Sequence, residues 1–171
     1  MPTVRFAAAL VAVVAIHSFG VWLWPEFARS IDLFLVLTVL FARRGDTLAG
    51  LLGGLAAGLV HDVLGAGPFA LHGFANTAVG YAVARLSQRL MVDRTSGVLL
   101  MTLLATVVQR TILAGLTLAL LPDPVLPEPS WTALLVTTTA VTAATFFAAS
   151  RRLKGGLATR RSNRSKRLHF D

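Results

Sequence analysis

A stripe of small residues constrains the fold of this chain more than any other feature. Gly50, Gly54, Gly58 and Asp62 recur every four residues, so they share one narrow face of an α-helix. In water each such glycine would weaken a helix by about 1 kcal/mol relative to alanine. In a bilayer the same spacing lets a neighbouring helix approach closely, because packing rather than the hydrophobic effect holds helices together there. The stripe predicts a helix-packing seam that ends in a carboxylate.

Composition predicts that this seam lies in a membrane. The 171 residues are 55% hydrophobic and only 14% charged, with a mean hydropathy of +0.70, which is too apolar for a soluble domain of this size. The absence of cysteine excludes disulfides, iron–sulfur clusters and thiol catalysis. No HExxH, GxSxG or P-loop pattern occurs. We therefore expect no enzymatic activity and no cofactor.

Six apolar segments predict an all-α, polytopic integral membrane domain over residues 1–150. The segments are 4–24, 27–42, 47–64, 69–86, 98–121 and 131–149. The second is short, because residues 31–42 span only about 18 Å as a helix against a hydrocarbon core of roughly 30 Å. Starting this helix at Phe27 makes it a marginal span, with Asp32 near its outer boundary. Gly67 and Pro68 predict the turn that sets the angle of the fourth helix.

The distribution of arginine predicts the topology. With a cytoplasmic N-terminus, the inner side carries arginines 5, 43, 44, 85, 89 and 94 and the basic tail, whereas the outer side carries only Arg29. The three tryptophans then fall at the outer interface, as an aromatic belt would. We expect both termini in the cytoplasm.

The net charge of +8 is concentrated in a tail, residues 151–171. Half of the sixteen basic residues lie there: Arg151, Arg152, Lys154, Arg160, Arg161, Arg164, Lys166 and Arg167. The polar composition of the tail predicts disorder in isolation. Attraction to anionic lipid contributes around 1 kcal/mol per basic residue, so we expect lipid contact and no nucleic-acid binding. A cytoplasmic partner with an acidic face is an open alternative.

Two charged residues are expected at membrane depth. Asp62 lies about 24 Å and Arg110 about 20 Å above the cytoplasmic helix ends, with His72 at a similar level. Each charge costs about 2.5 to 3.5 kcal/mol to insert, so we expect an Asp62–Arg110 pair whose hydrogen bonds are completed by His72, His61, Asn76 or His17. The favoured interpretation is structural, and a site for an ion, proton or small anion is the alternative. His61, His72 and Asp62 lack the fixed spacing of a metal site, and no metal is predicted.

One part of the chain, roughly residues 30–90, resembles the rod-shape-determining MreD family. The resemblance rests on Ser30-Ile31-Asp32-Leu33, Arg43-Arg44-Gly45, the run GLLGGLAAGLVHD from Gly50 to Asp62, GPFALHG from Gly67 to Gly73, and Val79-Gly80-Tyr81. Family members often have proline where this chain has Ile31. The resemblance implies a non-enzymatic scaffold of cell-wall elongation in the bacterial cytoplasmic membrane. It also implies MreC as partner, with RodA, a class B penicillin-binding transpeptidase and MreB as further associates.

A second function class fits the same architecture. Substrate-binding membrane subunits of vitamin transporters are similar six-helix proteins, and such a subunit would bind a small molecule near Asp62, His72 and Arg110. The short outer loops leave little material for a lid, although residues 122–129 could form one. An intramembrane enzyme would need a second acid or a nucleophile beside Asp62, and none is evident in the sequence.

Overall fold

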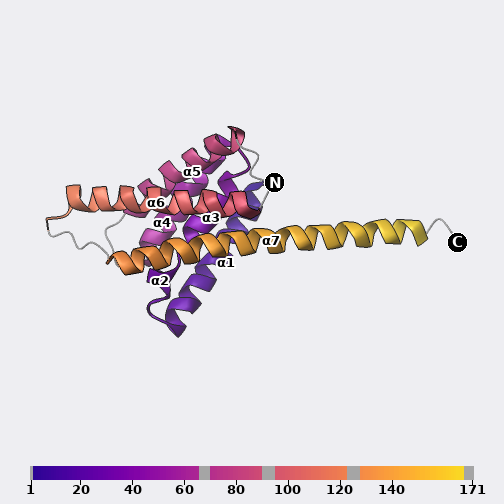
Figure 1. Ribbon diagram of the computed structural model, residues 1–171, viewed down its shortest axis with the longest axis horizontal. Helices are drawn as coiled ribbons and strands as arrows, with labels where there is room; N and C mark the ends of the chain where they lie inside the picture. Colours follow the sequence, from indigo (N-terminus) through magenta and orange to yellow (C-terminus); the bar gives the residue numbers. More distant parts are fainter. Residues whose placement is uncertain (1, 66–69, 90–94, 123–127, 168–171) are drawn as a thin grey trace.

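The computed structural model describes the chain except residues 1, 66–69, 90–94, 123–127 and 168–171, and gives backbone alone for residues 2 and 151–167. The predicted Gly67-Pro68 turn lies outside the described residues. The described part is all-helical (Figure 1). Its helices are α1 (Pro2–Leu23), α2 (Phe27–Ser30), α3 (Leu33–Ala42), α4 (Thr47–Leu64), α5 (Leu71–Arg89), α6 (Thr95–Leu120) and α7 (Pro129–Arg167).

Four of these helices are long and apolar enough to cross a membrane. They are α1 over Thr3–Leu23, α4, α6, and α7 over Pro129–Ser150. The α3 helix has only 10 residues, and α5 has 19 residues but is less apolar. The chain therefore has the pattern of an α-helical membrane protein, while the count of six crossings stays a prediction.

The second predicted segment is broken rather than continuous. The α2 helix ends at Ser30, Ile31 is extended, and α3 begins after Asp32. The Asp32 Oδ1 accepts a hydrogen bond from the backbone N–H of Leu35 at 2.8 Å, as an N-cap residue does. The expected single helix from Phe27 to Ala42 is thus wrong, because the Asp32 side chain caps a new helix. Asp32 is also buried, with 2% of its surface exposed.

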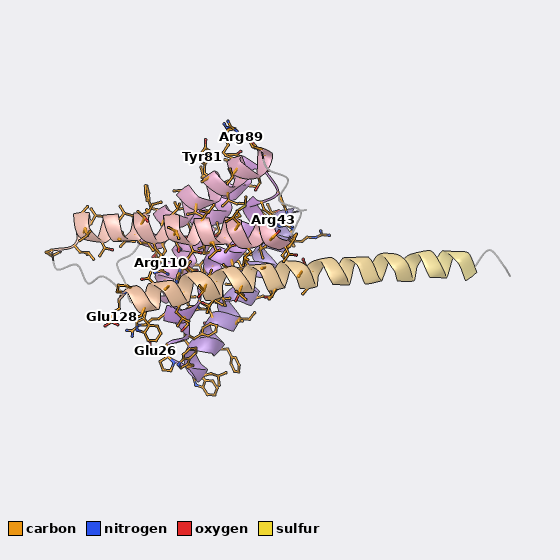
Figure 2. All side chains as sticks on the ribbon, viewed as in Figure 1. Glu26, Arg43, Tyr81, Arg89, Arg110 and Glu128 are labelled. Carbon is orange, nitrogen blue, oxygen red and sulfur yellow. The ribbon has the colours of Figure 1, made fainter. Side chains whose placement is uncertain are left out.

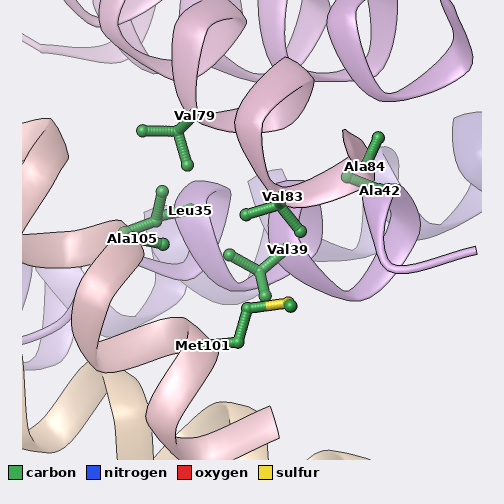
Figure 3. Packing of buried hydrophobic residues seen from close by; sticks show 8 residues of the cluster. All are labelled: Leu35, Val39, Ala42, Val79, Val83, Ala84, Met101 and Ala105. Atoms are coloured by element: carbon green, nitrogen blue, oxygen red, sulfur yellow. The ribbon is translucent and has the colours of Figure 1, made fainter. Parts of the chain in front are cut away.

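The short α3 helix lies inside the bundle. It contacts α1, α4, α5, α6 and α7. Side chains from α3, α5 and α6 form a compact apolar cluster, shown in Figure 3: Leu35, Val39, Ala42, Val79, Val83, Ala84, Met101 and Ala105. Among the described residues of α1, in contrast, only His17 is buried.

The stripe glycines lie at the interface of α4 and α5. A Cβ atom added to Gly58 would meet the His72 carbonyl, and one added to Gly54 would meet the Asn76 carbonyl. A Cβ atom added to Gly50 would lie 2.7 Å from the Gly80 carbonyl oxygen. Backbone packs directly against backbone along this face, so only glycine fits at these three positions.

The α7 helix continues well beyond the bundle. Figure 1 shows it leaving the bundle at the end where the N-terminus lies, and its backbone stays helical to Arg167. The disorder expected for the isolated tail stays a prediction. Arginine, lysine, leucine and alanine favour helix, and no proline follows Pro129.

Candidate functional site

Polar side chains gather near one end of the bundle, here called the distal end. Figure 2 shows Glu26, Arg110 and Glu128 toward this end, and Arg43 and Arg89 toward the opposite one. The cluster beneath the distal end is formed by buried or half-buried residues of α1, the α3 cap, α4, α5 and α6: His17, Asp32, His61, Asp62, His72, Asn76, Gln109 and Arg110. Polar groups at such depth are expensive unless they are paired.

The Asp32 carboxylate is the centre of this cluster. Its side chain is 1% exposed, and its Oδ2 accepts a hydrogen bond from Gln109 Nε2 at 2.8 Å. The Arg110 Nη2 lies 4.0 Å from the same oxygen, and His61 Nδ1 lies 3.9 Å from Oδ1. The Asp32 backbone N–H donates to Thr139 Oγ1 at 3.0 Å. Asp32 therefore joins α3 to α4, α6 and α7.

Two amide side chains extend this network to α5. The Gln109 Nε2 donates to Asn76 Oδ1 at 2.8 Å as well as to Asp32. Both amide residues are fully buried. Because a buried polar group without a partner is costly, this network fixes how α3, α5 and α6 pack against one another.

The Asp62 carboxylate accepts hydrogen bonds from the first turn of α5. Its Oδ1 accepts from the His72 backbone N–H at 3.1 Å and lies 2.8 Å from His72 Nδ1, and its Oδ2 accepts from the Gly73 N–H at 2.9 Å. The side chain is 1% exposed. These bonds satisfy N–H groups that a helix start leaves unpaired, and the negative charge suits the positive end of the helix dipole.

The buried charges are paired differently from the sequence-based expectation. Asp62 and His72 do lie together, but Arg110 lies beside Asp32 instead of Asp62. Asp62 already accepts bonds at both oxygens. Sequence reasoning missed Asp32 as the partner, although an aspartate directly before an apolar helical run is an N-cap signal that places it at a helix start.

A row of rings crosses the cluster. The His61 ring centroid lies 4.2 Å from that of His72 and 5.9 Å from that of His17, and His61 stacks on Phe34 at 4.8 Å. Within the described ranges, no three histidine or acidic residues are grouped closely enough to hold a metal ion.

A cavity of about 520 Å³ opens at the distal end. Its polar lining comes from α2, α4, α5, α6 and the start of α7: Arg29, His61, His72, Arg110, Glu128, Trp131 and Thr132. This volume is within the range of sites for small organic molecules. The Arg29 side chain is 70% exposed and pairs with Glu26 at 3.1 Å, so Arg29 belongs to the mouth of the cavity.

The role of Asp62 as a cap leads to a testable prediction. We expect Asp62→Asn to lower the free energy of unfolding by about 1 to 2 kcal/mol, because the negative charge at the N-terminus of α5 is lost. The measurement is thermal unfolding of the purified protein in detergent. Asp46→Asn is the matched control, because Asp46 caps α4 through Ala49 N–H at 3.0 Å but is exposed. An Asp46 effect as large as that of Asp62 would contradict the prediction.

The tail side chains lie outside the described part of the structure, so the lipid contact predicted for them stays a prediction.

Comparison of the whole chain with family models, curated proteins and solved structures finds no match.

Proposed function

We propose that this protein is a non-enzymatic membrane scaffold of bacterial cell-wall elongation that binds MreC in the cytoplasmic membrane. One observation carries the proposal. The longest stretch that resembles the MreD family, Gly50 to Asp62, lies on α4, where Gly50, Gly54 and Gly58 meet the backbone of α5. RodA, a penicillin-binding transpeptidase and MreB would join through the same assembly. A rigid unit of closely packed helices suits a protein that holds partners in place.

The charge distribution supports six crossings with both termini in the cytoplasm. The basic extension of α7 and the N-terminus share one end of the bundle, as an even number of crossings requires (Figure 1). Arg43 and Arg89 lie toward that end, and Glu26 and Glu128 lie toward the other (Figure 2). This is the asymmetry of the positive-inside rule. In this topology α2 and α3 together form one crossing and α5 forms another.

A second candidate function is supported by the distal cavity. A volume of about 520 Å³ with convergent polar side chains is what a small-molecule subunit of a vitamin-type transporter would need. The cavity includes Arg110 and His72 but not Asp62 in its lining. The scaffold remains the first proposal because all three seam glycines lie in the resembling segments, whereas of the cavity lining only His61 and His72 do.

Co-purification separates the two functions. The tagged full chain is extracted from its native membranes in mild detergent, and the bound proteins and small molecules are identified by mass spectrometry. We expect MreC, with or without wall synthases, to be recovered with the wild type. Recovery of an ATPase module or of a stoichiometric vitamin-like molecule in its place would overturn the scaffold proposal. A tagged Gly115→Leu variant is a suitable control, because a Cβ atom added at Gly115 meets no atom within 4 Å.

A further inference from the structure

The distal cavity has several hydrogen-bond donors in its lining. Arginine side chains and the tryptophan N–H donate and do not accept, and the lining contains Arg29, Arg110 and Trp131. Among the described lining residues, Glu128 is the acid. A ligand that matches such a surface carries several acceptor atoms close together.

Arg110 has donors that the protein does not use. Its Nε atom is buried and has no hydrogen-bond partner, and its Nη2 lies 4.0 Å from Asp32 Oδ2, beyond hydrogen-bond length. The two Asp32 oxygens already accept from Leu35 N–H and Gln109 Nε2. The Arg110 side chain is 23% exposed and borders the cavity. Its accessible N–H groups can therefore bind an oxyanion from the cavity side.

The sign of the charge facing the cavity follows from which acids reach it. Asp32 and Asp62 have side chains that are 1% exposed, and they are absent from the lining. Arg29 and Arg110 do line it, and Glu128 offsets one of these two charges. At the cavity surface two guanidinium groups thus face one carboxylate, which favours an anion over a cation, while Glu26 pairs with Arg29 and Asp32 lies near Arg110 outside the lining.

The level of the cavity points to phosphate as the anion. Trp131 is part of the lining, and Trp22, in the last turn of α1, and Trp24, just after α1, are exposed. Tryptophans of membrane proteins concentrate at the interface, where lipid headgroups lie. Figure 2 places Arg110 and Glu128 toward the distal end of the bundle. A volume of about 520 Å³ accommodates a headgroup or a small phosphorylated molecule.

We propose that the distal cavity binds a phosphate group through Arg110, with Arg29 at the mouth, and that this group is carried by a lipid headgroup or by a soluble phosphorylated compound. The site is independent of the choice between scaffold and transporter subunit, because the binding chemistry is the same in both. Glu128 lowers the affinity of the site for an anion.

The test uses the tryptophan in the lining as a local reporter. Trp22→Phe and Trp24→Phe leave Trp131 as the single tryptophan of the chain. The full-length protein is delipidated in detergent and titrated with phosphatidylglycerol, with inorganic phosphate, and with dioleoylglycerol, which has no phosphate. Trp131 fluorescence reports on the cavity, so lipid bound by the basic tail at the opposite end does not contribute. Native mass spectrometry gives the stoichiometry.

We expect a saturable change of Trp131 emission with one phosphate-bearing ligand and none with dioleoylglycerol. A response to phosphatidylglycerol alone assigns the headgroup as the source, and a response to inorganic phosphate assigns a soluble compound. Arg110→Gln should weaken binding by about tenfold or more, which is about 1.4 kcal/mol. Arg29→Gln, at an exposed position, should weaken binding by about threefold while the protein stays folded. Glu128→Gln should preserve or strengthen it.

Arg89→Gln is the matched control, because Arg89 is exposed at the opposite end of the bundle (Figure 2). It should leave the titration unchanged. Equal responses to dioleoylglycerol and phosphatidylglycerol, or no response to either phosphate source, would overturn the proposal. So would unchanged binding in Arg29→Gln together with loss of binding in Glu128→Gln, since that pattern describes a cation site.

Discussion

Replacing Gly54 with leucine is expected to prevent the helical bundle from assembling. A Cβ atom at this position would collide with the Asn76 carbonyl oxygen and lie 2.8 Å from the Asn76 carbonyl carbon. These are backbone atoms, so no side-chain rotation relieves the contact. Overpacking a core costs about 1 to 3 kcal/mol where side chains can shift, and here the α5 backbone itself must move. We expect a loss of at least about 3 kcal/mol.

The change at Gly54 is measured by size-exclusion chromatography and thermal unfolding in detergent. Displacing Asn76 also strains its hydrogen bond with Gln109, so the damage should spread to the polar network. Gly115→Leu introduces the same side chain on α6, where the added Cβ atom meets nothing within 4 Å and the residue is exposed. It should behave as the wild type. A monodisperse Gly54→Leu protein with wild-type unfolding and undiminished MreC recovery would refute the seam.

The α4 helix illustrates what the sequence makes predictable. Its predicted range of residues 47–64 coincides with the observed Thr47–Leu64. The apolar run is bounded by Asp46, which caps it, and by Gly65, where the chain becomes extended. The glycine period also indicated which face of the helix is narrow. Such local signals suffice because the helix start, its end and its packing face are all determined within a few residues.

The second segment shows where local signals compete. Its apolar run predicts one continuous helix, yet in the structure the helix is broken at Ile31 and Asp32. Ser30 and Asp32 both offer side-chain oxygens that bond to nearby backbone, which favours a cap over helix continuation. The length of the apolar run does not distinguish one continuous helix from a helix that is broken at Asp32. Burial of Asp32 depends on Thr139 and Gln109, which lie far away in the chain.

The charge pairing shows a different limit. Rise per residue gives the depth of a side chain along its helix, and depth correctly placed Asp62 and His72 near each other. It does not determine toward which neighbour a side chain at that depth points. Arg110 follows Gln109 on α6, and the hydrogen bonds of Gln109 turn this face toward Asp32 and Asn76. Helix rotation is set by tertiary contacts that one sequence does not reveal.

Replacing Asp32 with leucine is expected to be the most damaging single change within the polar cluster. It removes the cap on Leu35 N–H and the acceptor of Gln109, and it leaves Arg110 without its nearest carboxylate. Removing one partner of a buried charge pair costs about 3 to 5 kcal/mol. Arg110→Leu should be milder, because Asp32 keeps the hydrogen bonds from Leu35 and Gln109. Unfolding in detergent, followed by circular dichroism, compares the two variants.

A double-mutant cycle then shows which carboxylate is energetically coupled to Arg110. Adding Arg110→Leu to Asp32→Leu removes the stranded guanidinium, so the double variant should regain about 1 kcal/mol or more over Asp32→Leu alone. The matched cycle with Asp62→Leu should be additive within about 0.5 kcal/mol, because Asp62 bonds to the start of α5 and not to Arg110. Coupling in the Asp62 cycle and additivity in the Asp32 cycle would reverse the assignment. The guanidinium would then face α4, and the cavity would lose the donor on which phosphate binding depends.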